Sequence, residues 1–238
     1  MPWVRSGCGD DKTGSVTNGA LSRRSGTLLA LLAGLCAIGA ALVAPSAAEP
    51  VRIVAFGDSL IAGLGLEAKD AFPVKLEAAL KAKGYDVRIA NAGVSGDTTT
   101  AGLARLDWSI PQGTHAVILE LGANDALRGI SPAVPRLALD AMIRRLKERH
   151  IEVLLVGMRA PPNLGSEYAA AFDRIYPDLA KTHDLILYPF FLDGIAGDSR
   201  FNQRDGLHPN PAGVDIIVEH ILPPVEKLIS RVETKRKN

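Results

Sequence analysis

Cysteine is nearly absent from this chain, whose 238 residues include only Cys8 and Cys36. Both lie within the first 48 residues, a segment that we expect to be removed from the finished protein. The remaining chain would then contain no disulfide and no thiol nucleophile, so packing alone must stabilise it. About 190 residues are enough for one ordinary domain with a substantial core.

Aromatic residues and net charge are low as well. Aromatic residues make up 5% of the chain, and Trp108 is the only tryptophan after residue 48. The 27 basic and 26 acidic residues nearly cancel, and no basic face stands out. The basic end of the chain, Arg231 with residues 235–237, is predicted to be a solvated tail. We therefore expect no nucleic acid partner.

The first 48 residues have the three parts of a secretory signal. An uncharged apolar run at residues 27–43 follows Arg23 and Arg24 and precedes the small residues 44–48. This pattern predicts cleavage before Glu49 and export to the periplasm or the medium. A retained membrane anchor is the alternative, because the run is nearly long enough to cross a membrane. The leucine that precedes Cys36 does not suit a lipoprotein cleavage site, so no lipid anchor is predicted.

Apolar runs and helix-period stretches alternate along the rest of the chain. The strand-like runs are 51–56, 87–91, 115–121, 152–158 and 185–189, and the helical stretches are 72–83, 99–108, 132–150, 166–182 and 211–232. Such alternation predicts an α/β fold in which a parallel sheet carries helices on both faces. We predict a single domain over residues 49–238.

A serine, a histidine and an aspartate stand out against this framework. Ser59 directly follows the first predicted strand in a Gly-Asp-Ser-Leu string, and Asp205 precedes His208 by three positions. Each signal has an ordinary reading, as turn residues or as a helix-start or surface ion pair. However, ligands bind at the carboxyl ends of strands in open parallel sheets, where Ser59 would lie. A serine nucleophile needs a base, and a carboxylate fixes the tautomer of that base.

The surroundings of His208 favour a loop rather than a helix. Pro209 and Pro211 exclude a helix interior there, and Asn210 is a plausible cap for the helix that follows. The other histidines have no ligand-like spacing and no cysteine partners, so no metal site is predicted; they are His115, His150, His183 and His220.

The loops after the second and third predicted strands carry further polar groups. Gly93 lies in the first loop and Asn124 in the second. A backbone N–H at Gly93, the N–H of Ser59 and the Asn124 amide are suitable donors for an oxyanion. Taken singly, the glycine is explained by a tight turn and the asparagine by a cap. Together with the serine, aspartate and histidine they form a set that chance rarely assembles.

These motifs resemble those of the SGNH-hydrolase family, also called the GDSL esterase/lipase family. The likeness covers essentially the whole chain after residue 48, through residues 56–60, 91–98, 120–129 and 205–210. Residues 102–106 and 175–177 resemble the subgroup of bacterial periplasmic acyl-CoA thioesterase I, lysophospholipase and arylesterase. The resemblance implies a flavodoxin-like three-layer α/β/α sandwich with a five-stranded parallel sheet.

The resemblance also implies the roles of the site residues. Ser59 would be the nucleophile, His208 the general base and then acid, and Asp205 the group that orients His208. Ser59, Gly93 and Asn124 would form the oxyanion hole. The chain would be a serine esterase that cleaves carboxylic esters and thioesters through an acyl-serine intermediate, with no cofactor.

Substrate identity is less well specified. Leu127, Pro162 and Leu164 are candidate walls of an acyl groove, although turn and capping chemistry explains these positions nearly as well. Small acyl esters, lysophospholipids and acyl thioesters are the expected substrates, and a monomer without a stable membrane anchor is the expected form. A carbohydrate O-deacetylase and a catalytically silent secreted binding module are the alternatives.

Overall fold

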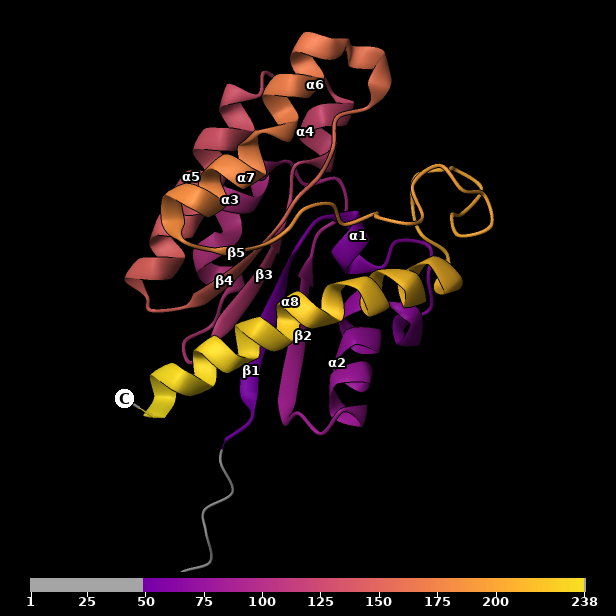
Figure 1. The fold of residues 1–238 in the computed structure, drawn as a ribbon. Helices are drawn as coiled ribbons and strands as arrows, with labels where there is room; N and C mark the ends of the chain where they lie inside the picture. The colour runs from indigo at the N-terminus through magenta and orange to yellow at the C-terminus, as the bar shows by residue number, and fades with distance from the viewer. Residues whose placement is uncertain (1–48, 238) are drawn as a thin grey trace, which may run out of the picture. The chain divides into compact units, whose positions relative to one another are not determined.

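The computed structural model describes residues 49–237, so the predicted signal segment lies outside the described residues. Five strands and eight α-helices follow one another along this part of the chain (Figure 1). The strands are β1 (Val51–Gly57), β2 (Val87–Gly93), β3 (Ala116–Glu120), β4 (Glu152–Val156) and β5 (Ile186–Tyr188). The helices are α1 (Ser59–Ala62), α2 (Phe72–Ala82), α3 (Thr99–Ser109), α4 (Ala123–Leu127), α5 (Ala133–Glu148), α6 (Ser166–Asp173), α7 (Ile175–His183) and α8 (Pro211–Lys237). None of the helices in this range is long and apolar enough to cross a membrane.

The five strands form one parallel sheet in the order β2-β1-β3-β4-β5. Helices α2 and α8 pack together on one face, and α3, α5 and α7 cover the other (Figure 1). The predicted α/β fold with a five-stranded parallel sheet is therefore confirmed. Because all strands run the same way, the loops that follow them gather at one edge of the sheet.

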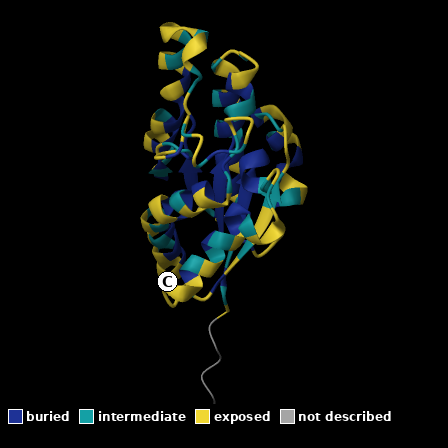
Figure 2. Cartoon of the chain, turned by 90° about the vertical axis from the view of Figure 1, so that its right-hand side faces the viewer, coloured by how far each residue is buried: buried dark blue, intermediate teal, exposed yellow. Residues whose placement is uncertain are grey.

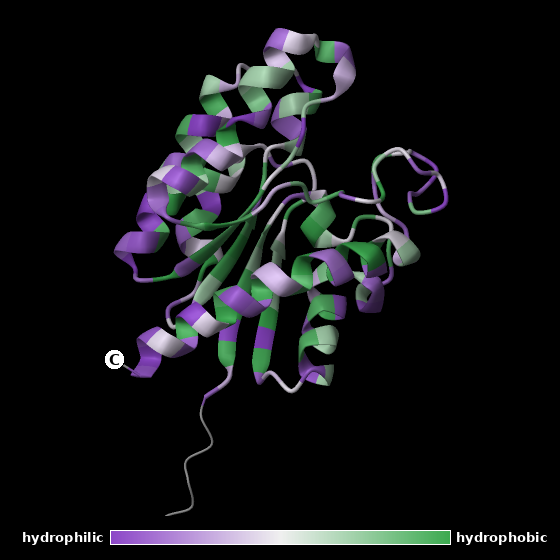
Figure 3. Ribbon diagram, viewed as in Figure 1, coloured by the Kyte–Doolittle hydropathy of each residue, from purple (hydrophilic) through white to green (hydrophobic). Residues whose placement is uncertain are grey.

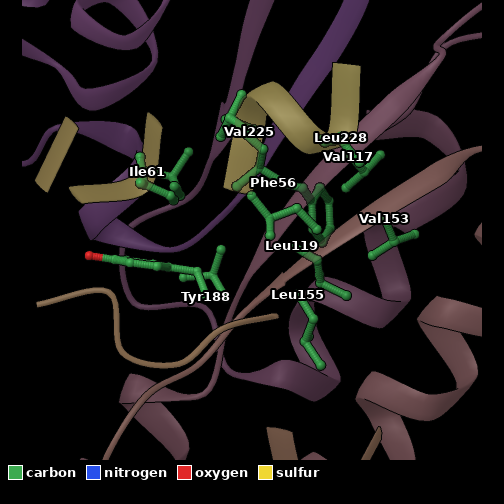
Figure 4. Close-up of a cluster of buried hydrophobic side chains, with 14 of the residues drawn as sticks. Phe56, Ile61, Val117, Leu119, Val153, Leu155, Tyr188, Val225 and Leu228 are labelled. Atoms are coloured by element: carbon green, nitrogen blue, oxygen red, sulfur yellow. The ribbon is translucent and has the colours of Figure 1, made fainter. Parts of the chain in front are cut away.

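The core lies where the sheet meets its helices. Strands β3 and β4 are buried along almost their whole length, and Figure 2 shows the sheet in dark blue between exposed helix surfaces. The same strands are the most hydrophobic part of the chain in Figure 3. Figure 4 shows buried side chains from the strands, among them Phe56, Leu119 and Leu155, and Val225 and Leu228 of α8. Burying one such side chain contributes roughly 1.5–3 kcal/mol.

The helix predicted at 166–182 is wrong in one respect, because the structure divides it into α6 and α7 at Arg174. Pro177 explains the division, since it has no N–H to donate to the Asp173 carbonyl and its ring opposes a continuous helix. The prediction also missed two short helices, α1 and α4, which are below the length that periodicity can detect. These two helices begin at the carboxyl edge of β1 and β3.

Arg105 on α3 ties the carboxyl ends of two strands together. Its guanidinium donates to the carbonyl of Gly57 at 2.8 Å and to that of Ala92 at 2.9 Å. It also pairs with Asp97 at 2.5 Å and lies 4.1 Å above the Phe56 ring. The side chain is only 8% exposed, so solvent does not compete with these bonds. One buried cation therefore fixes the ends of β1 and β2 and the loop after β2.

We predict that Arg105→Lys lowers the free energy of unfolding by about 1–3 kcal/mol, because a lysine cannot reach both carbonyls and a buried acceptor loses its donor. Urea denaturation measures the change. Arg144→Lys is the matched control, since Arg144 is 66% exposed and pairs with Asp140 on the surface of α5. Equal effects of the two substitutions would contradict a special role of Arg105.

Candidate active site

Ser59 is the first residue of α1 and directly follows the turn that ends β1. Asp58 caps this helix by accepting from the Leu60 N–H at 3.0 Å. Gly57 is required in the turn, because a Cβ there would lie 2.5 Å from the Glu120 carbonyl oxygen. The helix ends after one turn at Gly63, which has a left-handed conformation with φ +80°. The serine side chain is thus held at the start of a short, rigid turn.

Three predicted catalytic residues lie in one hydrogen-bonded line. Ser59 Oγ is 2.9 Å from His208 Nε2, although the two residues are 149 positions apart. His208 Nδ1 is 2.7 Å from Asp205 Oδ2. The structure therefore brings together the serine, histidine and aspartate that sequence reasoning singled out. This is the geometry in which an imidazole can take the serine proton while a carboxylate holds its other nitrogen.

Backbone bonds hold Asp205 in place. Its Oδ1 accepts from the N–H groups of Leu207 at 2.9 Å and His208 at 3.0 Å. These two bonds, followed by the His208 side chain, lower the pKa of Asp205 to about 2. The carboxylate therefore stays ionised throughout the neutral and mildly acidic range. The loop continues as predicted into Asn210, whose side chain accepts from the Gly213 N–H at the start of α8.

Asn124 is the second residue of α4. This helix begins directly after Gly122, which follows β3 and has a positive φ. Asn124 Nδ2 donates to Asp58 Oδ2 at 3.1 Å and to the Asp97 carbonyl at 3.0 Å. The amide is thereby fixed to the loops that follow β1 and β2. It lines the same cavity as Ser59 and His208.

Gly93, the glycine predicted to bind the oxyanion, and Gly96 lie differently relative to the cavity. Gly93 still belongs to β2, paired in register with Gly57, and its N–H donates to Asn91 Oδ1 at 2.9 Å. Gly96, three residues later, lines the cavity with Ser59 and has φ +85°. Among the described residues, no acceptor takes the N–H of Gly96 or of Ser59. Because β2 runs two residues beyond its predicted end, Gly93 remains in the strand, and we propose Gly96 as the glycine that donates to the oxyanion.

A cavity of about 470 Å³ opens beside Ser59. Of the three predicted wall residues, Leu127 and Pro162 line it and Leu164 does not. Sequence reasoning missed six apolar lining residues, which come from separate loops: Leu60, Leu64, Met158, Phe190, Leu192 and Leu207. The lining is largely apolar, which suits an acyl group better than a sugar.

Two charged residues that organise the site also went unnoticed. Arg105 reads as an ordinary helix residue, and Glu120 as the end of a strand. For Glu120 the available signal was an acid directly after the continuously apolar run 116–119, where both faces of a parallel strand are buried.

No metal centre is found within residues 49–237, where no three His, Cys, Asp or Glu side chains are grouped to hold an ion. The remaining histidines make ordinary contacts. His115 Nδ1 accepts from the Arg52 N–H, and His183 lies 2.6 Å from Asp140.

Known proteins are similar to this chain in sequence and in fold. A family model described as "GDSL-like Lipase/Acylhydrolase family" matches residues 55–216. "Esterase TesA" of Pseudomonas aeruginosa is 38% identical over 201 residues, which cover 84% of this chain and 99% of that protein. "Thioesterase 1/protease 1/lysophospholipase L1" of Escherichia coli K12 is 36% identical over 185 residues, covering 77% of this chain and 88% of that one.

A solved structure agrees with these relatives. The crystal structure of AlinE4, "a SGNH-hydrolase family esterase", is 48% identical and superposes with a TM-score of 0.64, covering 75% of this chain and 96% of that chain. The residues that the family model matches include Ser59, Asn124, Asp205 and His208. The chain belongs to the GDSL-like lipase/acylhydrolase family and is an ester hydrolase.

Proposed function

We propose that the chain is a serine esterase that hydrolyses carboxylic ester and thioester bonds of small acyl substrates through an acyl-Ser59 intermediate. The observation that carries this proposal is the line from Ser59 Oγ through His208 to Asp205 at the edge of an apolar cavity. No cofactor takes part.

In the first step Ser59 Oγ attacks the carbonyl carbon and His208 Nε2 takes its proton. The imidazolium then protonates the departing alcohol or thiol, which leaves the acyl group on the serine. Water attacks this acyl-enzyme, again losing its proton to His208, and the acid is released with Ser59 regenerated. Asp205 accepts from the Nδ1–H of His208 throughout and stabilises the imidazolium.

The negative charge on the carbonyl oxygen needs fixed donors in each step. The N–H groups of Ser59 and Gly96 have no acceptor among the described residues, so both are available. Both hydrogens of the Asn124 amide already have acceptors, Asp58 Oδ2 and the Asp97 carbonyl. An oxyanion must therefore share one of these hydrogens, which makes Asn124 a donor of limited strength.

The apolar lining supports acyl esters as the substrate class, including aryl esters and lysophospholipids. The signal-like segment before Glu49 supports an exported enzyme without a stable membrane anchor. One chain supplies the whole line from Ser59 through His208 to Asp205, so the site needs no second copy to complete it, and we propose a monomer.

Ser59→Ala is expected to lower kcat for p-nitrophenyl butyrate by at least about 10³-fold, because the nucleophile is lost while the oxyanion donors remain. The melting temperature should stay within a few degrees, which circular dichroism measures. Ser230→Ala on the exposed surface of α8 is the control. Undiminished hydrolysis by the Ser59 variant would refute the proposal.

Asp205→Asn should lower kcat by about 10²- to 10⁴-fold, because the imidazolium loses its carboxylate. The Asp205 side chain is 45% exposed, so solvent screens its charge and we expect a loss of kcat near the smaller of these two values. Steady-state kinetics measure the change. Asp193→Asn is the control, since Asp193 is another exposed aspartate near a histidine, 3.7 Å from His220. A kcat reduced equally by both changes, or by neither, would argue against the role of Asp205.

Leu127→Ala should shift the chain-length profile toward short acyl groups, lowering the ratio of kcat/KM for decanoate to that for acetate by about three- to tenfold. This corresponds to about 1 kcal/mol of lost apolar contact. A series of p-nitrophenyl esters from acetate to palmitate measures the profile. Leu164→Ala is the matched control, because Leu164 does not line the cavity. Wild-type activity confined to acetate would favour the deacetylase instead.

A further inference from the structure

Asp58 is a fully buried acid that the catalytic steps above do not use. Both of its carboxyl oxygens accept hydrogen bonds, Oδ1 from the Leu60 N–H at 3.0 Å and Oδ2 from the Asn124 amide at 3.1 Å. The first bond belongs to the helix that carries Ser59, and the second belongs to the side chain predicted to bind the oxyanion. The Asp58 carboxyl group thus connects the start of the Ser59 helix to the Asn124 amide.

Glu120 lies on the core side of the same turn and is also fully buried. Its Oε2 is 3.4 Å from the Asp58 backbone nitrogen, which donates to it. Gly57 makes room for this carboxyl, since a Cβ there would lie 2.6 Å from Oε2. The other oxygen, Oε1, has no hydrogen-bond partner among the described residues. Glu120, the last residue of β3, therefore packs directly against the turn between β1 and Ser59.

The surroundings favour a single negative charge on this pair. Arg105 from α3 reaches the turn through the Gly57 carbonyl, but its carboxylate partner is Asp97. Burial and the charge of Asp58 raise the pKa of Glu120 well above its ordinary value. Burial raises the pKa of Asp58 to about 6, opposed by its hydrogen bonds and by His208 in the loop before α8, while the charge of Asp97 raises it further. Asp58 accepts two hydrogen bonds and Glu120 accepts only one long bond, so the negative charge of the pair is better stabilised on Asp58.

We infer that Asp58 and Glu120 form a buried carboxyl pair that positions the oxyanion donors: Asp58 holds the Asn124 amide and the start of the Ser59 helix, and Glu120 holds Asp58 from the core. This inference rests on the proposed function and extends it. Both acids are positioning residues, because neither lines the cavity where substrate would lie.

The ionised form of Asp58 suits this task. A carboxylate only accepts hydrogen bonds, so it can serve the Leu60 N–H and the Asn124 amide at once. An asparagine at position 58 has one accepting oxygen and must present its own NH₂ group to one of these donors. Asp58→Asn therefore keeps the shape of the side chain and removes one of the two contacts.

A double-mutant cycle tests the inference. Asp58→Asn should lower kcat for p-nitrophenyl butyrate about tenfold or more and leave KM within about twofold, because an oxyanion donor is misplaced. In the Asn124→Ala background the same change should lower kcat by no more than about twofold, since the oxygen of the new asparagine can still cap the Ser59 helix at the Leu60 N–H and the Asn124 amide is already gone. A tenfold loss in both backgrounds would overturn the inference, because a general loss of structure acts independently of Asn124.

Asp140→Asn is the matched control for the loss of a partly buried, hydrogen-bonded acid. Asp140 bonds His183 at 2.6 Å and does not line the cavity. Its substitution should leave kcat unchanged in both backgrounds.

The side-chain amide signals of Asn124 give a readout that does not depend on turnover. They are assigned by their loss in Asn124→Ala and should shift in Asp58→Asn protein, because the amide loses its carboxylate acceptor. Unchanged signals would overturn the inference. If wild-type protein shows no Ser59-dependent hydrolysis, the proposed function fails, and the amide signals still decide whether Asp58 holds Asn124.

Glu120 is tested by two substitutions of different chemistry. Glu120→Leu removes the acceptor for the Asp58 N–H and should lower kcat about tenfold without a matching change in KM. Glu120→Gln keeps an oxygen in the shape of the neutral acid and should recover kcat to within about threefold of the wild type. Equal losses in the two variants would show that the accepting oxygen does not matter. The Asp58 variant keeps the test decisive if Glu120→Leu fails to fold.

Discussion

The buried guanidinium of Arg105 is the interaction on which the arrangement of the site depends. Parallel strands bring their carboxyl ends to one edge, but they do not by themselves fix the loops that leave that edge. Arg105 bonds the last carbonyl of β1, the carbonyl of Ala92 in β2 and the Asp97 side chain. Asp97 in turn accepts from Asn124 through its carbonyl. A single cation on α3 therefore connects the serine, the glycine loop and the asparagine.

The site contains two kinds of acid, which differ in burial and in the direction in which their pKa is shifted. Asp205 lies near the surface, where two backbone N–H groups and His208 stabilise its charge and lower its pKa. Asp58 and Glu120 lie in the core, where burial raises the pKa of both. A stable exposed charge suits the orientation of an imidazole that becomes cationic. Two buried acids that disfavour a second charge can hold donors in place without placing two anions near the developing oxyanion.

Most of the sheet and the catalytic line followed from the sequence. Continuously apolar runs separated by helical stretches allow few arrangements other than a covered parallel sheet, so the parallel sheet and its layers came out as expected. Ser59, Asp205 and His208 were identifiable because a serine after a strand and an aspartate near a proline-flanked histidine have few alternative roles together. Short elements were missed: α1 and α4 have too few residues to show a period.

The sequence by itself indicated the fold class, the resemblance to an ester-hydrolase family and the candidate residues Ser59, His208 and Asp205, because these depend on residue type, on motifs and on regular spacing. The tertiary structure alone decided which glycine meets the cavity, since Gly93 remains in β2 and Gly96 lies beyond its end. It also decided that Leu164 is not a wall and that Glu120 packs under the nucleophile turn. Strand ends and contacts between distant loops depend on packing across the sheet, which no local pattern of residues encodes.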